Sequence, residues 1–319
     1  GARNFANKLW NSTRYVLLNL PEQVPAGGYS LRSLDPAKLE LADRWILSEF
    51  QAMSARVSER LEAYGVAAAA DELYAFLWDK FCDWYVELAK LRLLSADEEA
   101  KRVPRTVLVS VLTGTLKLLH PFMPFITEEL YAALKPFAGE KADLLLDAGA
   151  GLPEGFGQDE QALSEMAFLM GAVGSLRALR SQLNVPPSLK IEALYSAKNG
   201  GEEALLRGQH GYLSHLARIA VLKPAPGGRP AQSATAAAGG LVFYVPLAGI
   251  IDLDKEKKRL TKEVERLAAE LSRCEIRLAD KAFLARAPES EVEKIRRRRE
   301  AMAAEHGSLV DTMRGLDSP

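Results

Sequence analysis

Hydrophobic residues recur in steps of three and four along the first part of the chain, the pattern of helices that bury one face. Pro21 ends the first such segment. Asp35 and Pro36 suit the N-cap and first helical position of a second, and Gly65 is placed to cap its end. The helices predicted in this way cover 2–20, 36–64, 71–94, 102–119 and 120–134. Five helices with short connections predict an antiparallel bundle over residues 1–140.

The pattern changes after positions 136–159, where Gly, Pro and Asp are frequent and predict a domain boundary. Residues 189–195 then alternate between apolar and polar, as a half-buried strand does. The remaining predicted elements are helices over 160–181 and 202–216, strands over 219–222 and 241–245, and an Ala/Gly-rich loop over 224–240. Together they predict a small α+β junction domain over residues 160–250.

The last segment carries a heptad pattern. All four d positions are apolar, namely Leu253, Leu260, Leu267 and Cys274. Three of the four a positions are also apolar, namely Val264, Leu271 and Leu278, and the fourth is Lys257. The pattern breaks over 283–288 and then resumes. One register pairs Leu278 with Ile295, Leu271 with Met302 and Val264 with Leu309. These runs predict an antiparallel coiled-coil hairpin over residues 252–319, roughly 40 Å long at 1.5 Å per residue. The predicted fold class is therefore mainly α.

Composition narrows the functional classes. Of 319 residues, 48% are hydrophobic and 26% charged, which is typical of soluble globular proteins. Two cysteines, at 82 and 274, leave no material for a disulfide framework or a Cys-rich metal site, and they fit a reducing cytoplasm. No run of about 18 apolar residues predicts a membrane span. Because the chain does not begin with methionine, we expect it to be a piece of a longer protein.

Charge is unevenly distributed although the net charge is −1. Between Lys255 and Leu316 there are 16 Lys and Arg against 12 Asp and Glu, whereas the rest has 25 against 30. This split predicts an acidic body with a basic arm. The run Arg296 to Arg299 wraps more than one helical turn, so at least two guanidiniums must face solvent. They form either an ordinary solvated face or contacts to phosphates.

The search for catalytic groups finds little. The four histidines are scattered, and no glycine-rich phosphate loop appears. The chain places three carboxylates in one stripe, at Asp79, Asp83 and Glu87. Such a stripe would suit acid–base chemistry, but a solvated polar face is the favoured interpretation. Among the nearby aromatic residues, Trp78 and Tyr85 fall off the apolar stripe. They would stack on bases or, as we favour, pack against a neighbouring helix or domain.

Several motifs carry a family resemblance. They are Arg-Asn-Phe-Ala-Asn-Lys at 3–8, Phe-Cys-Asp-Trp-Tyr-Val-Glu at 81–87, His-Pro-Phe-Met-Pro-Phe at 120–125, Asn-Val-Pro-Pro at 184–187 and Ala-Pro-Glu at 287–289. In this order they resemble the C-terminal half of the valyl-tRNA synthetases, which are class I aminoacyl-tRNA synthetases. The opening motif and the terminal hairpin favour the valyl over the isoleucyl and leucyl enzymes.

The resemblance implies an anticodon-binding bundle, a junction domain and an arm that lies against the tRNA elbow. It implies a valine–tRNA ligase as the parent enzyme, with valine-accepting tRNA and the enzyme's own N-terminal catalytic and editing domains as partners. Both ATP-binding signatures of class I synthetases are missing, so this segment is expected to be non-catalytic and to hold no cofactor. ATP with magnesium and valine would bind the catalytic domain. We expect a cytoplasmic monomer that does not bind membranes.

The candidate tRNA-binding residues follow from these expectations. In the bundle they are Arg3, Asn7, Lys8, Asn11 and Arg14 on one predicted helix face, with Trp78, Asp83 and Trp84. Asp83, Trp84 and Glu87 would alternatively orient the bundle. In the arm the candidates are Lys258, Lys262, Arg266, Arg273, Arg277, Arg296 and Arg297. Two other readings remain open: a helical protein-interaction module, and a hydrolase that uses the carboxylate stripe.

Overall fold

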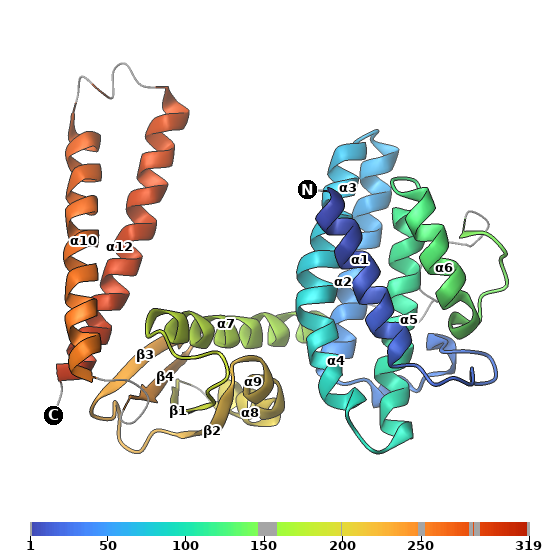
Figure 1. The fold of residues 1–319 in the computed structure, drawn as a ribbon, viewed down its shortest axis with the longest axis horizontal. Coiled ribbons are helices and arrows are strands. Elements are labelled where there is room, and N and C mark those ends of the chain that lie inside the picture. The colour runs from blue at the N-terminus through green and yellow to red at the C-terminus, as the bar shows by residue number, and fades with distance from the viewer. Residues whose placement is uncertain are drawn as a thin grey trace. The chain divides into compact units, whose positions relative to one another are not determined.

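The structure is a computed structural model that describes residues 2–145, 158–198, 200–247, 253–280, 283 and 288–317 (Figure 1). The chain forms two compact units, unit 1 over residues 1–168 and unit 2 over residues 169–319. Both are mainly α, and unit 2 adds a small four-stranded sheet, which confirms the predicted fold class. The division into three domains stays a prediction.

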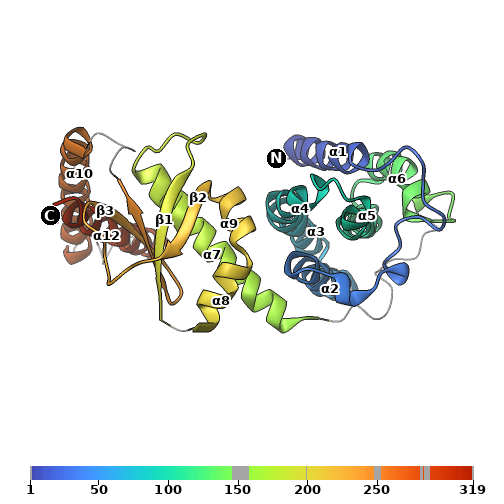
Figure 2. The ribbon, with the colours of Figure 1, turned by 90° about the horizontal axis from the view of Figure 1, so that it is seen from below.

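Unit 1 is a helical bundle built around one central helix. Its helices are α1 (Ala2–Leu18), α2 (Leu41–Glu62), α3 (Val66–Ala75), α4 (Val86–Leu93), α5 (Glu98–Leu119) and α6 (Pro124–Ala138). The helix α5 is apolar on most sides, from Val103 through Leu116, and lies among the other helices (Figure 2). Gly114 allows close packing there, because a Cβ on it would meet Cζ of Phe50 at 2.6 Å.

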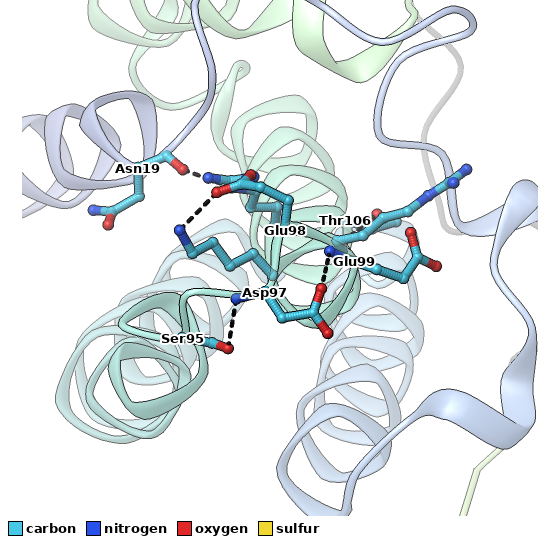
Figure 3. A network of polar contacts seen from close by, with 9 residues as sticks. Asn19, Ser95, Asp97, Glu98, Glu99 and Thr106 are labelled. Carbon is cyan, nitrogen blue, oxygen red and sulfur yellow. Dashed lines mark hydrogen bonds and ion pairs between the residues drawn. The ribbon is translucent and has the colours of Figure 1, made fainter.

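The start of α5 is fixed by caps and ion pairs (Figure 3). Asp97 accepts a hydrogen bond from the Glu99 N–H at 3.0 Å, as an N-cap does. Glu98 pairs with Lys101 at 2.7 Å and with Arg105 at 2.6 Å, and Arg105 also donates to the Asn19 carbonyl at 2.7 Å. These contacts tie the end of the first helical segment to α5.

Both predicted caps of the second helix are only partly right. Asp35 does cap, but it caps the short 3-10 turn η2 (Pro36–Lys38), which follows the similar turn η1 (Leu31–Ser33). The helix α2 begins later, where the Glu40 N–H donates to Asp43 at 3.0 Å. At its end Tyr64, not Gly65, takes the left-handed conformation, with φ of 58°. The Gly65 N–H bonds to the Arg60 carbonyl, which completes a Schellman motif.

The third predicted helix is one helical rod with a wide middle. Residues Phe76–Tyr85 form the π-helical segment η3 between α3 and α4. A π-helix brings a residue back to the same face later than an α-helix does, because its hydrogen bonds span five residues. Tyr85 is therefore fully buried, and the prediction that it lies off the apolar stripe was wrong. On the same rod Tyr74 is exposed and Trp84 is half-exposed.

Unit 2 begins inside α7 (Glu160–Gln182) and contains a mixed sheet of order β2-β1-β4-β3. Its elements are β1 (Ile191–Ala197), α8 (Gly200–Gly208), α9 (His210–Leu216), β2 (Ile219–Pro224), β3 (Ser233–Ala238) and β4 (Leu241–Pro246). Strand β1 pairs in parallel with β2 and antiparallel with β4, and β3 pairs antiparallel with β4. In the described chain α7 is the one helix that is long and apolar enough to span a membrane, by length and composition, and 39% of its most apolar stretch is buried inside the molecule.

Two predictions about this region were wrong. The predicted helix over 202–216 is two helices, α8 and α9, separated at Gln209. The Ala/Gly-rich segment over 224–240 is not all loop, because β3 lies within it and pairs along its length with β4. Alanine has low strand propensity, so the ladder with β4 rather than local preference makes this strand.

The arm consists of α10 (Leu253–Ala279) and α12 (Glu289–Asp317), which run side by side in opposite directions (Figure 1). Heptad positions form the contact face, and Leu260, Leu267, Val292, Met302 and Leu309 are buried. The two antiparallel helices of the predicted hairpin are confirmed, whereas most of the predicted break over 283–288 lies outside the described residues. The individual layer pairs stay predictions, and Leu253 and Lys257 have side chains outside the described part. The far end of α12 packs on β3, where Arg229 donates to the Asp311 carbonyl.

Candidate nucleic-acid interface

One exposed face of α1 carries four polar side chains together with Trp10 and Leu18. Arg3, Asn7, Asn11 and Arg14 are all exposed and follow one another in steps of four, four and three. The opposite face, with Leu9, Thr13 and Val16, is fully buried in the bundle. The helix is therefore oriented by its apolar face, and the four predicted polar side chains reach solvent together.

Lys8 is the exception among the predicted residues of α1. It is half-buried, forms an ion pair with Asp83 at 2.7 Å and lies over the Trp78 ring at 5.0 Å. Burial works against its charge, but the hydrogen bond and charge of Asp83 outweigh that effect and raise the Lys8 pKa. Lys8 thus joins α1 to η3, and reaching a phosphate would require breaking this pair.

Trp78 belongs to a stack of aromatic rings between α1 and the η3 rod. The Phe5 and Tyr74 rings stack with centroids 5.0 Å apart, and Tyr74 and Trp78 stack at 5.6 Å and 12°. Tyr74 and Lys8 therefore both lie against Trp78, which supports packing against a neighbouring helix over base stacking. Trp84 is half-exposed on the same rod.

The carboxylate stripe lacks the features of an acid–base site. Asp83 is paired with Lys8, Glu87 is paired with Lys90 at 2.5 Å, and Asp79 is exposed. The neighbouring Cys82 contacts the Ser12 hydroxyl at 2.9 Å, and burial raises its pKa to about 11, so its thiol is protonated at neutral pH. No group of three or more metal-ligating side chains occurs among the described residues.

Sequence reasoning missed the buried polar network that holds the rod to α2. Asp43 is 1% exposed and accepts hydrogen bonds from the Tyr85 hydroxyl at 2.7 Å and from the Glu40 N–H at 3.0 Å. Arg92 forms ion pairs with Asp43 and, at 3.1 Å, with Glu40. Burial opposes the charge of Arg92, but the two carboxylates raise its pKa. The sequence feature that pointed to this network is Asp43 itself, an aspartate within an apolar run.

The basic residues of the arm fall into two groups. Arg266 is held between Glu263 at 2.6 Å and Glu270 at 2.5 Å, so its charge is compensated within α10. Lys258, Lys262 and Arg273 are exposed, and the last two have no ion pair within the described chain. Lys262 and Arg273 are therefore the arm cations most available to an anion.

The arginine run of α12 is mainly solvent-facing. Arg296, Arg297 and Arg298 are exposed, whereas Arg299 is half-buried, which confirms that at least two guanidiniums face solvent. Arg297 pairs with Glu293 at 3.2 Å and Arg298 pairs across the hairpin with Glu270 at 3.3 Å. Near the tip a groove of about 400 Å³ is lined by Glu270, Arg273, Cys274, Arg277, Ile295 and Arg298.

The charge distribution differs from the predicted acidic body with a basic arm. Unit 1 holds 17 Lys and Arg against 24 Asp and Glu, a net charge of −7. Residues 169–247 hold 8 against 3, a net charge of +5. The junction region is therefore at least as basic as the arm, and only unit 1 is acidic.

Comparisons with known proteins agree with this layout. A family model described as "Anticodon-binding domain of tRNA ligase" matches residues 43–195, and one described as "Valyl tRNA synthetase tRNA binding arm" matches residues 252–317. Valine–tRNA ligases are similar over most of the chain. Those of Syntrophotalea carbinolica, Carboxydothermus hydrogenoformans and Clostridium acetobutylicum are 40%, 41% and 36% identical over 93%, 93% and 92% of it.

The chain carries the anticodon-binding and tRNA-binding arm domains of the valine–tRNA ligases. It spans about a third of these relatives, namely 33%, 32% and 32% of their lengths. The seven candidate residues of the arm lie within the matched arm of the valine–tRNA ligases. The polar face of α1 precedes the matched anticodon-binding range, and residues 196–251 lie outside both matched ranges.

Proposed function

We propose that this chain is the tRNA-holding part of a valine–tRNA ligase, in which the bundle binds the anticodon region of valine-accepting tRNA. The arm would act as an antiparallel coiled coil that lies along the tRNA elbow. The observation that carries the proposal is the matched arm over 252–317, whose exposed cations include Lys262 and Arg273. Cations on a rigid helical hairpin suit the phosphates of a folded RNA.

The catalytic chemistry would be carried out by the part of the parent enzyme that lies outside this chain. There valine would be activated with ATP and magnesium and transferred to the tRNA. The present chain would supply no catalytic residue, because two of the three carboxylates of its stripe pair with Lys8 and Lys90, and it would bind no cofactor. The proposed protein is a cytoplasmic monomer without membrane contact, and the catalytic and editing domains of the same enzyme are its other partners.

Within the bundle, two kinds of residue are proposed. Arg3, Asn7, Asn11 and Arg14 would contact the anticodon stem, since all four are exposed on one face. Lys8, Trp78 and Asp83 would position α1 on the rod, since Lys8 of α1 pairs with Asp83 and lies over the Trp78 ring. Trp84 is half-exposed, so it would serve either to contact the anticodon stem or to position the bundle.

The proposal is tested by fluorescence anisotropy with valine-accepting tRNA and with the same tRNA carrying an altered anticodon, at several salt concentrations. Tighter binding of the cognate tRNA, with affinity that falls as salt rises, is expected. Equal binding of the two tRNAs would refute the anticodon assignment. If the affinity did not change with salt concentration, the proposed contacts between the arm and tRNA phosphates would be refuted. That result would favour a protein-interaction module.

The arm is tested separately with Arg296→Gln/Arg297→Gln. Both side chains are exposed and share one acidic neighbour, Glu293, so their loss should flatten the salt slope by up to about 1.8, at about 0.9 per duplex phosphate contact. Arg56→Gln/Arg60→Gln in α2 makes the same charge change on the bundle and should leave the slope nearly unchanged. An equal effect of both pairs would remove the arginine run from the interface.

A further inference from the structure

The region between the bundle and the arm carries more positive charge than its own acids can compensate. Residues 169–247 have eight Lys and Arg but only Glu192, Glu202 and Glu203 as acids. Within the described part of this region, Lys223 pairs with Glu192 at 2.6 Å, and five of the eight charges stay in excess. In unit 1, by contrast, eleven of the seventeen cations are in ion pairs.

A buried arginine organises part of this charge. Arg180 on α7 is 7% exposed and donates to three backbone carbonyls, of Pro186 at 2.9 Å, Leu189 at 2.8 Å and Arg218 at 3.4 Å. No carboxylate pairs with it in the described chain. The carbonyls come from two separate segments, the approach to β1 and the approach to β2. Arg180 therefore fixes these two backbones relative to each other.

Two exposed cations project from the backbones that Arg180 fixes. In the parallel pair of β1 with β2, Ile191 lies opposite Ile219, and the Ile191 N–H donates to the Arg218 carbonyl at 3.0 Å. Lys190 and Arg218 come directly before the paired residues, so they are neighbours at the amino ends of the two strands. Both are exposed, and neither has an ion pair within the described residues.

The backbone at Arg218 is an unusual place for a long side chain. Arg218 follows the end of α9 in the left-handed conformation, with φ of 56°, where helices commonly place glycine. Burial, followed by the charge of Arg218, lowers the pKa of Arg180, so the two guanidiniums repel each other. A cation retained in spite of backbone strain and like-charge repulsion indicates a use outside folding.

We propose that Lys190 and Arg218, held in place by Arg180, form a binding site for the backbone phosphates of RNA. The proposal rests on the proposed tRNA-binding function and extends it to the amino ends of β1 and β2, which hold none of the candidate tRNA-binding residues named above. Two cations on fixed neighbouring strands suit adjacent phosphate groups, whose negative charge would relieve the repulsion around Arg180. Unit 2 would then bind RNA through its sheet domain as well as through its arm.

The test compares two charge-matched variants of the full chain by anisotropy with labelled valine-accepting tRNA. Lys190→Gln/Arg218→Gln removes the site. Lys198→Gln/Arg207→Gln removes two other exposed cations of the same region, beyond the carboxyl end of β1 and on α8, and serves as the control. The site variant should bind about tenfold more weakly with a salt slope flatter by up to about 1.8. The control should change affinity by less than about threefold.

The outcomes separate this site from the general proposal. A wild-type chain that does not bind the tRNA would overturn the tRNA-binding function and this site with it. Salt-dependent wild-type binding with an unchanged slope in the site variant would overturn the site alone, as would equal losses in both variants. Loss of binding to phosphatidylserine vesicles, with tRNA binding intact, would overturn RNA as the ligand.

Arg218→Gly adds a readout that a structural role would not produce. Glycine relieves the left-handed strain, so the urea midpoint of the chain's far-UV circular dichroism transition, to which both units contribute, should rise or stay unchanged. Binding to tRNA should nevertheless weaken about threefold or more, because one phosphate contact is lost. A glycine variant that folds as well and binds as well as the wild type would overturn the assignment of Arg218.

Discussion

Replacing Asp43 with asparagine tests the buried network that fastens α2 to the η3 rod. The substitution keeps the shape of the side chain and one acceptor for the Tyr85 hydroxyl, but it removes the charge that faces Arg92. Asp43 is 1% exposed, so water cannot replace the lost carboxylate. The new side-chain amide would also direct its hydrogens toward the Glu40 N–H or the Arg92 guanidinium.

The magnitude follows from burial. Removing one partner of a buried ion pair costs about 3–5 kcal/mol. Arg92 keeps its contact with Glu40 at 3.1 Å, but that carboxylate is 51% exposed and such a pair contributes up to about 1 kcal/mol. We therefore expect Asp43→Asn to lower the free energy of unfolding of unit 1 by about 3 kcal/mol.

Tryptophan fluorescence makes this measurable in the full chain. All four tryptophans, at positions 10, 45, 78 and 84, lie in unit 1, so the signal reports that unit alone. With a urea m-value of about 2 kcal/mol/M, the midpoint should fall by about 1.5 M. Asp79→Asn, an exposed acid on the same rod without a described ion pair, should shift it by less than about 0.3 M.

A double-mutant cycle checks the reasoning. Arg92→Met alone leaves the Asp43 carboxylate buried without its cation, so it should also be strongly destabilising. The double variant Asp43→Asn/Arg92→Met should lose less than the two single losses together, by about 1 kcal/mol or more. Strict additivity, or an Asp43→Asn midpoint equal to that of the wild type, would show that the network does not hold the rod.

Three further predictions concern packing, backbone and pH. Gly114→Ala should destabilise unit 1 by about 1–3 kcal/mol in urea titrations, since a Cβ 2.6 Å from Phe50 overpacks the core by more than the helix-propensity gain of about 1 kcal/mol; a stabilised variant would contradict this. Tyr64→Gly should stabilise the chain by about 1 kcal/mol by relieving a φ of 58° at a side chain that is 92% exposed, with Tyr64→Ala as the control that should not. Hydrogen bonds from Lys101 and then Arg105 lower the Glu98 pKa from 4.5 to about 2, so the stability from this carboxylate is fully present above pH 4.5 and is lost as the pH falls toward 2. Acid unfolding titrations of the wild type and of Glu98→Gln should therefore converge near pH 2. Curves that stay apart at that pH would disprove this prediction.

Local patterns predicted the helices and the heptad face of the arm. Leu9, Val16, Leu260 and Leu309 are buried as their spacing requires, because helical periodicity fixes which side chains share a face. Residues far apart in sequence fixed the details. The π-helical segment η3 buries Tyr85 on Asp43, 42 positions away, and an α-helical period could not show this.

The candidate sites divide in the same way. The spacing of Arg3, Asn7, Asn11 and Arg14 was sufficient to place them together, since all four belong to one helix. Lys190 and Arg218 are far apart in the sequence, and only the parallel pairing of β1 with β2 makes them neighbours. The sequence by itself determined the helices, their buried faces and the family. The tertiary structure decided which distant charges meet, because strand pairing and buried ion pairs depend on contacts that no local pattern encodes.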